Sequence, residues 1–135
     1  MLDITPIERI EKMYELMVHT HFSSAHSLRG YQGKCEELHG HNWKVGVQIA
    51  AETLDNLGMV IDFKVLKQEL HQIIQRLDHK HLNHIPPFDA LNPSSENIAF
   101  YIFQELKQLL THDRIIVAKV TVWESDDSSA SYSEK

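Results

Sequence analysis

The sequence lacks the features that several large classes of protein require. Cys35 is its single cysteine, so no disulfide forms within the chain, and a free thiol is typical of a reducing cytoplasm. No apolar run approaches the roughly 20 residues of a membrane-spanning helix, and the first residues do not resemble a signal peptide. A formal net charge of −6 argues against a general basic face for nucleic acid or anionic membranes. We expect a cytoplasmic protein with neither partner.

Histidine is the residue type in excess, with ten among 135 residues. The chain is short enough to form one domain over residues 1–135, with residues 1–12 as an N-terminal extension. It shows no repeat, linker or low-complexity segment. A domain of this size also gains stability from oligomerisation.

Apolar periodicity predicts two strands, two helices and two more strands. Asp62 and either Ser94 or Ser95 are in position to cap the helices, and residues 79–93, which contain three prolines, are expected to form a loop. The order ββααββ is typical of an α+β layer, in which an antiparallel four-stranded sheet carries two helices on one face. The expected strands are residues 14–26, 39–51, 115–124 and a short one around 130–132.

The stretch from residue 35 to 41 concentrates chemistry that a metal enzyme uses. It holds a thiol, carboxylates and two imidazoles, and it leads directly into the second strand. Alternate strand residues share a face, so His39 and His41 should lie on the buried face with Trp43. A hairpin would bring His26 beside them. Three imidazoles are the ligand set of a catalytic zinc site with one open position.

Pairing of histidines is weak evidence by itself in this sequence. His19 and His21 have the same spacing and fit a polar strand face. His79 and His81 lie near a helix end, where positions i and i+2 do not share a face. A structural role for His39 is therefore the alternative to metal binding at this point.

Other polar residues also have a structural and a chemical interpretation. Cys35 is either an inert small side chain or a base whose thiolate acts beside the metal. Asp78 and His79 are either an acid–base couple or a response to the helix C-terminus. Glu124 ends an apolar strand face. A carboxylate there is either exposed to solvent by the twist at the strand end or bound to a ligand that offers several hydrogen-bond donors. Glu96 fits the first turn of a helix, where a carboxylate complements the dipole.

Several segments occur in the order found in one known family. The chain resembles the 6-pyruvoyltetrahydropterin synthase family, and in particular its bacterial 6-carboxytetrahydropterin synthase branch, over about residues 14–132. The segments are Phe22-Ser23-Ser24-Ala25-His26, Cys35-x3-His39-Gly40-His41-Asn42, Leu77-Asp78-His79-x2-Leu82-Asn83, Asn92-Pro93-Ser94-Ser95-Glu96-Asn97 and Trp123-Glu124.

The resemblance implies a tunnelling fold whose sheets join into an oligomeric barrel, a homotrimer or a hexamer. It also implies a Zn²⁺ cofactor and a role for each matching residue. The implied roles are zinc binding for His26, His39 and His41; general base for Cys35; proton relay for Asp78 and His79; pterin anchor for Glu124; and pterin-pocket lining for Ser94, Ser95 and Glu96.

The implied reaction converts 7,8-dihydroneopterin triphosphate to 6-carboxy-5,6,7,8-tetrahydropterin, acetaldehyde and triphosphate, in queuosine biosynthesis. Arg29 and Lys34 are the nearest candidates to bind the triphosphate. Some relatives have Glu in place of the Cys and serve folate synthesis, and this chain carries Glu36 as well as Cys35. Formation of 6-hydroxymethyl-7,8-dihydropterin, or of both products, is therefore the main alternative. A 6-pyruvoyltetrahydropterin synthase is another, and a zinc and pterin binder without turnover would not need the relay.

Overall fold

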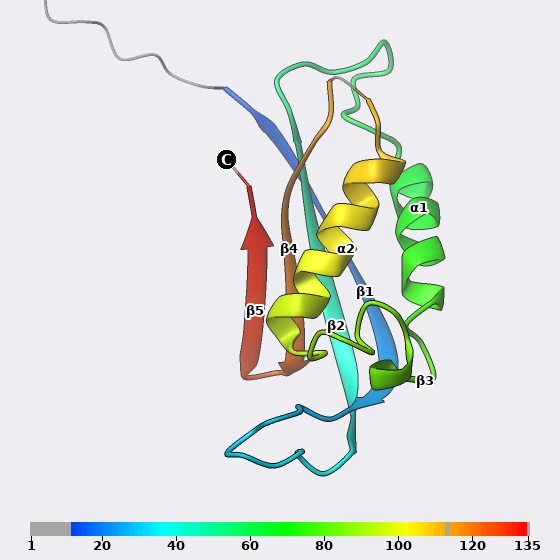
Figure 1. The fold of residues 1–135 in the computed structure, drawn as a ribbon. Helices are drawn as coiled ribbons and strands as arrows, with labels where there is room; N and C mark the ends of the chain where they lie inside the picture. Colours follow the sequence, from blue (N-terminus) through cyan, green and yellow to red (C-terminus); the bar gives the residue numbers. More distant parts are fainter. Residues whose placement is uncertain (1–11, 113, 135) are drawn as a thin grey trace, which may run out of the picture.

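The computed structural model describes residues 12–112 and 114–134, and their strands form one sheet in the order β3-β1-β2-β4-β5. Both helices pack on the same face of this sheet (Figure 1). Residues 1–11 of the predicted N-terminal extension lie outside the described residues. The elements are β1 (Tyr14–His26), β2 (His39–Ala51), α1 (Phe63–Gln75), β3 (Lys80–His81), the 3-10 turn η1 (Leu82–His84), α2 (Ser95–Leu109), β4 (Ile116–Ser125) and β5 (Ser128–Ser133).

The predicted α+β class and element order are confirmed, with one additional strand. The two-residue strand β3 lies within the segment predicted as a loop and pairs in parallel with Ser24 and Ala25 of β1. The sheet therefore has five strands and is mostly antiparallel. A strand of two residues has no periodicity to detect, and it forms here because β1 offers an unpaired edge at this point.

The β1–β2 hairpin contributes the centre of the core and determines where its polar ends meet. Its register pairs His26 with His39 and Ser24 with His41. Phe22 stacks on Trp43, with ring centroids 5.7 Å apart, and both rings are buried. Because the register runs without a shift along β1 and β2, the apolar face of the hairpin continues directly into its histidines.

The helices begin at the predicted caps. Asp62 accepts a hydrogen bond from the backbone N–H of Lys64, and Ser94 accepts one from that of Asn97. Such bonds satisfy N–H groups that have no partner within the helix. Helix α1 ends at Gln75, a few residues before the predicted end. No helix in the described part of the chain is long and apolar enough to cross a membrane.

Strand β4 departs from the alternation expected for it. Strict alternation from Glu124 back along the strand would put Ile116 on the core face, but Ile116 is 47% exposed and Val117 is buried instead. The register with β2 shifts between Gln48 and Ile49, and a bulge of this kind exchanges the two faces of a strand. Beyond the bulge Val120 and Val122 are buried as expected. The buried face therefore leads to Glu124 at the same end of the sheet as the histidines.

Candidate metal centre

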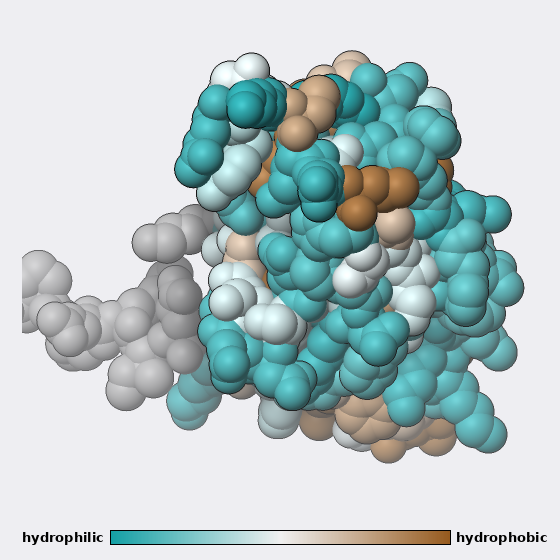
Figure 2. All heavy atoms as spheres, turned by 90° about the horizontal axis from the view of Figure 1, so that it is seen from below, coloured by the Kyte–Doolittle hydropathy of each residue, from teal (hydrophilic) through white to brown (hydrophobic). Residues whose placement is uncertain are grey.

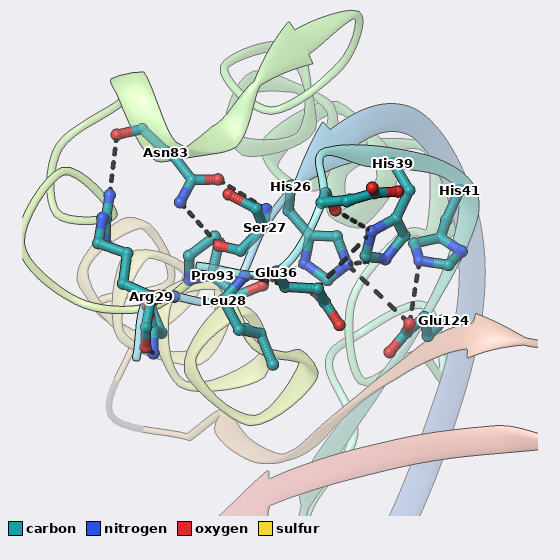
Figure 3. Close-up of polar contacts among 12 residues, drawn as sticks. His26, Ser27, Leu28, Arg29, Glu36, His39, His41, Asn83, Pro93 and Glu124 are labelled. Atoms are coloured by element: carbon teal, nitrogen blue, oxygen red, sulfur yellow. Dashed lines mark hydrogen bonds and ion pairs between the residues drawn. The ribbon is translucent and has the colours of Figure 1, made fainter. Parts of the chain in front are cut away.

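Three imidazoles converge where the β1–β2 hairpin opens (Figure 3). The ring centroids of His26 and His39 are 4.7 Å apart, and those of His26 and His41 are 5.1 Å apart. The Nε2 atoms of His26 and His39 approach to 3.1 Å. The hairpin register thus brings together the three residues that the sequence singled out.

Backbone carbonyls determine which ring nitrogen carries the proton in two of these imidazoles. His26 Nδ1 lies 2.7 Å from the Pro93 carbonyl oxygen, and His39 Nδ1 lies 2.8 Å from that of Glu37. A carbonyl oxygen only accepts, so each Nδ1 donates and, in a neutral ring, each Nε2 is left with a bare lone pair. Two lone pairs then face each other at 3.1 Å. A cation between them relieves this repulsion, and carbonyl-anchored imidazoles are typical of metal ligands.

The third imidazole also has an unsatisfied nitrogen. Nε2 of His41 is buried and has no hydrogen-bond partner among the described residues. Glu124 Oε1 is only 2.9 Å away but is not placed for a hydrogen bond. Burial lowers the pKa of His41, an effect that the charge of Glu124 partly offsets. A neutral imidazole with a free lone pair is what a divalent metal ion requires.

The donor set fits a single metal ion. One ligand atom from each of His26, His39, His41 and Glu124 lies within 4.8 Å of the others. In a tetrahedral zinc site with Zn–N bonds of about 2.0–2.1 Å, two ligand nitrogens stand roughly 3.3 Å apart. The 3.1 Å separation of the two Nε2 atoms is close to this spacing. The site therefore accommodates a metal with little rearrangement.

Of the two adjacent candidates for the base, Glu36 has a described contact with one histidine of the cluster, His39. Its Oε1 is 3.8 Å from His39 Nδ1 and accepts a hydrogen bond from the Leu28 N–H at 3.3 Å. The thiol of Cys35 is free and exposed.

Seen from the end of the molecule where residues 27–38 lie, the surface is mainly hydrophilic, with small apolar areas (Figure 2).

The predicted acid–base couple is formed, but the described contacts do not join it to the imidazoles. Asp78 Oδ2 lies 3.0 Å from His79 Nδ1, and Oδ1 accepts a hydrogen bond from the Ser23 N–H at 2.9 Å. This backbone bond, and to a lesser degree His79, lower the pKa of Asp78. The side chain of His79 is 81% exposed. The couple is therefore open to a molecule approaching from outside.

The residues expected to line a pterin pocket take different positions. Ser95 is buried, and its hydroxyl lies 3.5 Å from Glu124 Oε2, which places it at the metal centre. Ser94 serves as the N-cap of α2, and Glu96 is an exposed residue in the first turn of that helix. The described contacts thus connect only Ser95 to the histidine cluster.

Arg29, a candidate to bind triphosphate, contacts backbone carbonyls in the described structure. Its guanidinium donates to the carbonyl oxygens of Asn83 at 3.2 Å, Phe88 at 2.6 Å and Leu91 at 3.4 Å. These bonds explain the arginine as a structural residue that holds the 83–91 segment. Lys34 is exposed.

Sequence reasoning missed the supports of the site. The carbonyl of Pro93 has no side-chain signature, and only the fold brings it to His26. Asn83 and Asn92 stood within the recognised segments without an assigned role, and their hydrogen bonds could not be read from spacing.

The profile described as "6-pyruvoyl tetrahydropterin synthase" matches residues 15–135. The chain belongs to this family. It is 39% identical over 113 residues to an Archaeoglobus fulgidus protein provisionally named 6-carboxy-5,6,7,8-tetrahydropterin synthase, covering 84% of this chain and 90% of the relative. It is 40% identical over 95 residues to the Synechocystis 6-carboxy-5,6,7,8-tetrahydropterin synthase, covering 64% and 70%. These relatives confirm the expected enzyme family and its pterin synthase activity.

One further relative differs in its named activity, and a solved structure matches the fold. A dihydroneopterin monophosphate aldolase from Pyrococcus furiosus is 32% identical over 106 residues, which cover 78% of this chain and 85% of the relative. The structure of Caenorhabditis elegans 6-pyruvoyl tetrahydropterin synthase superposes with a TM-score of 0.79 at 25% identity, covering 92% of this chain and 97% of that one. The tunnelling-fold subunit is thereby confirmed.

We expect the protein to bind one divalent metal ion per chain and His39→Ala to lose it, because two imidazoles seldom hold such an ion tightly. The measurement is metal content by elemental analysis after incubation with excess Zn²⁺ and removal of unbound ion. His21→Ala is the matched control, since His21 lies on the same hairpin but outside the cluster. Less than about half an equivalent in the unmutated protein would contradict a tight metal site.

Proposed function

We propose that the protein is a zinc-dependent 6-carboxytetrahydropterin synthase of queuosine biosynthesis. Its substrates are 7,8-dihydroneopterin triphosphate and one water, and its products are 6-carboxy-5,6,7,8-tetrahydropterin, acetaldehyde and triphosphate. The metal requirement is supported by the bare Nε2 atoms of His26 and His39, which lie 3.1 Å apart in rings whose Nδ1 atoms are held by carbonyls. The named reaction is supported by the similarity to 6-carboxy-5,6,7,8-tetrahydropterin synthases. The single free cysteine is in keeping with a cytoplasmic location.

The chain's own residues divide the chemistry between them. A bound Zn²⁺ supplies Lewis acidity toward the hydroxyls of the substrate side chain. Cys35 removes a proton from the adjacent carbon as a thiolate, and the Asp78–His79 couple returns one. Glu124, beside the histidines and Ser95, accepts hydrogen bonds from the amino and ring N–H groups of the pterin. These assignments follow from the family resemblance, and for Glu124 they are supported by its contacts with His41 and Ser95.

A second candidate function is favoured by the position of Glu36. Its carboxylate lies beside His39, whereas the thiol of Cys35 is exposed, and the Pyrococcus furiosus relative is named an aldolase. In this second proposal Glu36 acts as base in an aldolase-type cleavage that yields 6-hydroxymethyl-7,8-dihydropterin. We propose that one metal site serves two bases, each linked to its own product.

Removal of each base should remove its own product. We expect Cys35→Ala to lower carboxytetrahydropterin formation by at least about a hundredfold, a usual contribution of a general base. Glu36→Ala should leave that reaction nearly intact and abolish any hydroxymethyldihydropterin. Products from dihydroneopterin triphosphate are identified and timed by mass spectrometry.

The neighbouring carboxylate of Glu37 provides the matched control for this pair. It is exposed, and only its backbone carbonyl contacts His39, so Glu37→Ala should leave both products unchanged. If Glu36→Ala abolishes both products while Cys35→Ala spares the first, the base for the main reaction is Glu36 and the assignment to Cys35 is wrong.

The substitution Glu124→Gln distinguishes two possible roles of Glu124, as a pterin anchor or as a metal ligand. The substitution keeps the volume but loses the charge and one acceptor oxygen, at a cost of about 1.5–3 kcal/mol for a hydrogen bond to a charged group. We expect affinity for a pterin product analogue to fall roughly 10- to 100-fold, with metal content unchanged. Calorimetric titration of the metal-loaded protein measures it. Loss of the metal would instead assign Glu124 to coordination.

The two unpaired edges of the sheet predict assembly. Strand β3 covers β1 only at Ser24 and Ala25, and β5 forms the other edge. Natural proteins pair or cover exposed strand edges, and edge pairing between copies would close a barrel with pterin sites at its seams. We expect a trimer or hexamer by light scattering at micromolar concentration. A stable monomer would refute the barrel.

A further inference from the structure

Beyond His26, at the end of β1, two asparagine side chains bond to the backbone where a neighbouring strand would otherwise pair. Asn83 Oδ1 accepts a hydrogen bond from the Ser27 N–H at 2.9 Å, and its Nδ2 donates to the Ser27 carbonyl at 2.8 Å. Asn92 forms the same pair of bonds with Arg29, at 2.8 and 3.0 Å. Each amide therefore satisfies both backbone groups of one residue, as a neighbouring strand would. We call these two side chains the amide clamps.

The residue between the clamped positions binds Glu36. Leu28 accepts a hydrogen bond from the Glu36 N–H at 2.9 Å, and its own N–H lies 3.3 Å from Glu36 Oε1. Backbone groups of successive residues in an extended segment point to opposite edges. The amide clamps hold one edge of residues 27–29, so the other edge is presented to Glu36. Both the backbone and the carboxylate of Glu36 are tied to the segment that the clamps fix.

The segment needs such support because the sheet does not provide it. Strand β3 stops at His81, so residues 27–29 have no strand partner on that edge. The loop that follows turns through Gly30 and Gly33, whose φ angles are +77° and +80°. These are conformations that glycine adopts without strain. The clamps therefore fix the residues that lead from the end of β1 into a turn whose backbone permits more than one path.

The type of side chain at positions 83 and 92 matches this task. An amide presents a donor and an acceptor side by side, whereas a carboxylate would set an acceptor against a carbonyl oxygen. Asn83 is buried, and the carbonyl of Asn92 is held in turn by Asn97 Nδ2 at 2.8 Å. The clamps are thus anchored to the body of the protein through η1 and α2 (Figure 3 shows Asn83).

We propose that Asn83 and Asn92 are positioning residues that hold Glu36, rather than the adjacent Cys35, beside the metal-centre residue His39. They hold residues 27–29, these hold Glu36, and the Glu36 carboxylate stands 3.8 Å from His39 Nδ1. In its catalytic consequence this inference rests on the proposed function. Loosening either clamp should then lower the Glu36-dependent product while leaving the Cys35-dependent product and the metal in place.

The first test needs no catalytic activity. Asn92→Asp keeps the shape and the acceptor oxygen but replaces the donor to the Arg29 carbonyl. In the zinc-loaded protein we expect the Leu28 and Glu36 amides to exchange with deuterium at least about tenfold faster, the effect of losing roughly one hydrogen bond, with zinc content unchanged. Asn83→Asp is the second variant, in which the same two amides should respond. Unchanged exchange at both amides in a folded variant overturns the proposal.

A matched control removes a comparable structural clamp elsewhere. Arg114 donates to the carbonyls of Thr53 and Val60, at 2.8 Å each, in a different loop. Arg114→Ala should therefore destabilise the protein without changing exchange at Leu28 or Glu36. Faster exchange at these amides in Arg114→Ala as well would show general destabilisation and would overturn a specific role for the asparagines.

The second test links the clamps to Glu36 through a double-mutant cycle. Asn92→Asp should lower kcat for the Glu36-dependent product at least about tenfold in the unmutated background, and in the Glu36→Ala background it should leave the remaining, Cys35-dependent turnover unchanged. Equal losses in both backgrounds would refute a role through Glu36. A protein that turns over no dihydroneopterin triphosphate in any background refutes the proposed function, and amide exchange then decides the positioning role by itself.

Discussion

The repulsion between two imidazole lone pairs is the constraint on which the rest of this structure depends. Neutral histidines do not ordinarily bring unprotonated nitrogens to 3.1 Å. Here the Pro93 and Glu37 carbonyls each accept a hydrogen bond from an Nδ1–H group, and the hairpin register sets the two rings side by side. Two metal-binding nitrogens therefore lie so close together that only a cation between them removes their repulsion. This is a property of the polypeptide itself, and it marks these histidines as a candidate metal centre.

One segment of the chain supports most of this centre. Between η1 and the start of α2, the carbonyl of Pro93 orients a metal ligand, and the amide clamps hold the residues that follow it. Arg29 returns three bonds to the carbonyls of the same segment. The two stretches thus stabilise each other. A ligand and a candidate base are held by one network, so a change in this segment can alter both metal geometry and base position.

The adjacency of Cys35 and Glu36 gives this network a functional meaning. Neighbouring residues in an extended stretch point in opposite directions, so the loop presents one of them at a time. The described conformation places the carboxylate beside His39 and leaves the thiol exposed. Relatives of this chain carry names for synthase and for aldolase activities. A single metal site with a choice of base is one physical route by which related proteins reach different products.

Local pattern was sufficient for the strands that hold the histidines and for the helix caps. The alternation of residues 39–49 determined that His39 and His41 share a face with Trp43, and a hairpin then placed His26 beside them. Asp62 and Ser94 act through neighbours in sequence, so their roles were also readable. The bulge in β4 could not be read from the sequence, because it depends on the register with its partner strand β2. Strand β3 was missed because two residues have no period.

The chemistry of the ligands came from the sequence, and their environment came from the tertiary structure. Residue type and spacing determined that three imidazoles would meet at the open end of the hairpin. Which ring nitrogen faces the metal was decided by carbonyls 67 residues distant in one case and two in the other. Which of Cys35 and Glu36 lies beside the histidines was decided by hydrogen bonds from Leu28 and by asparagines far along the chain. A backbone carbonyl has no side-chain identity, and contacts over such separations leave no periodicity, so only the folded chain could decide them.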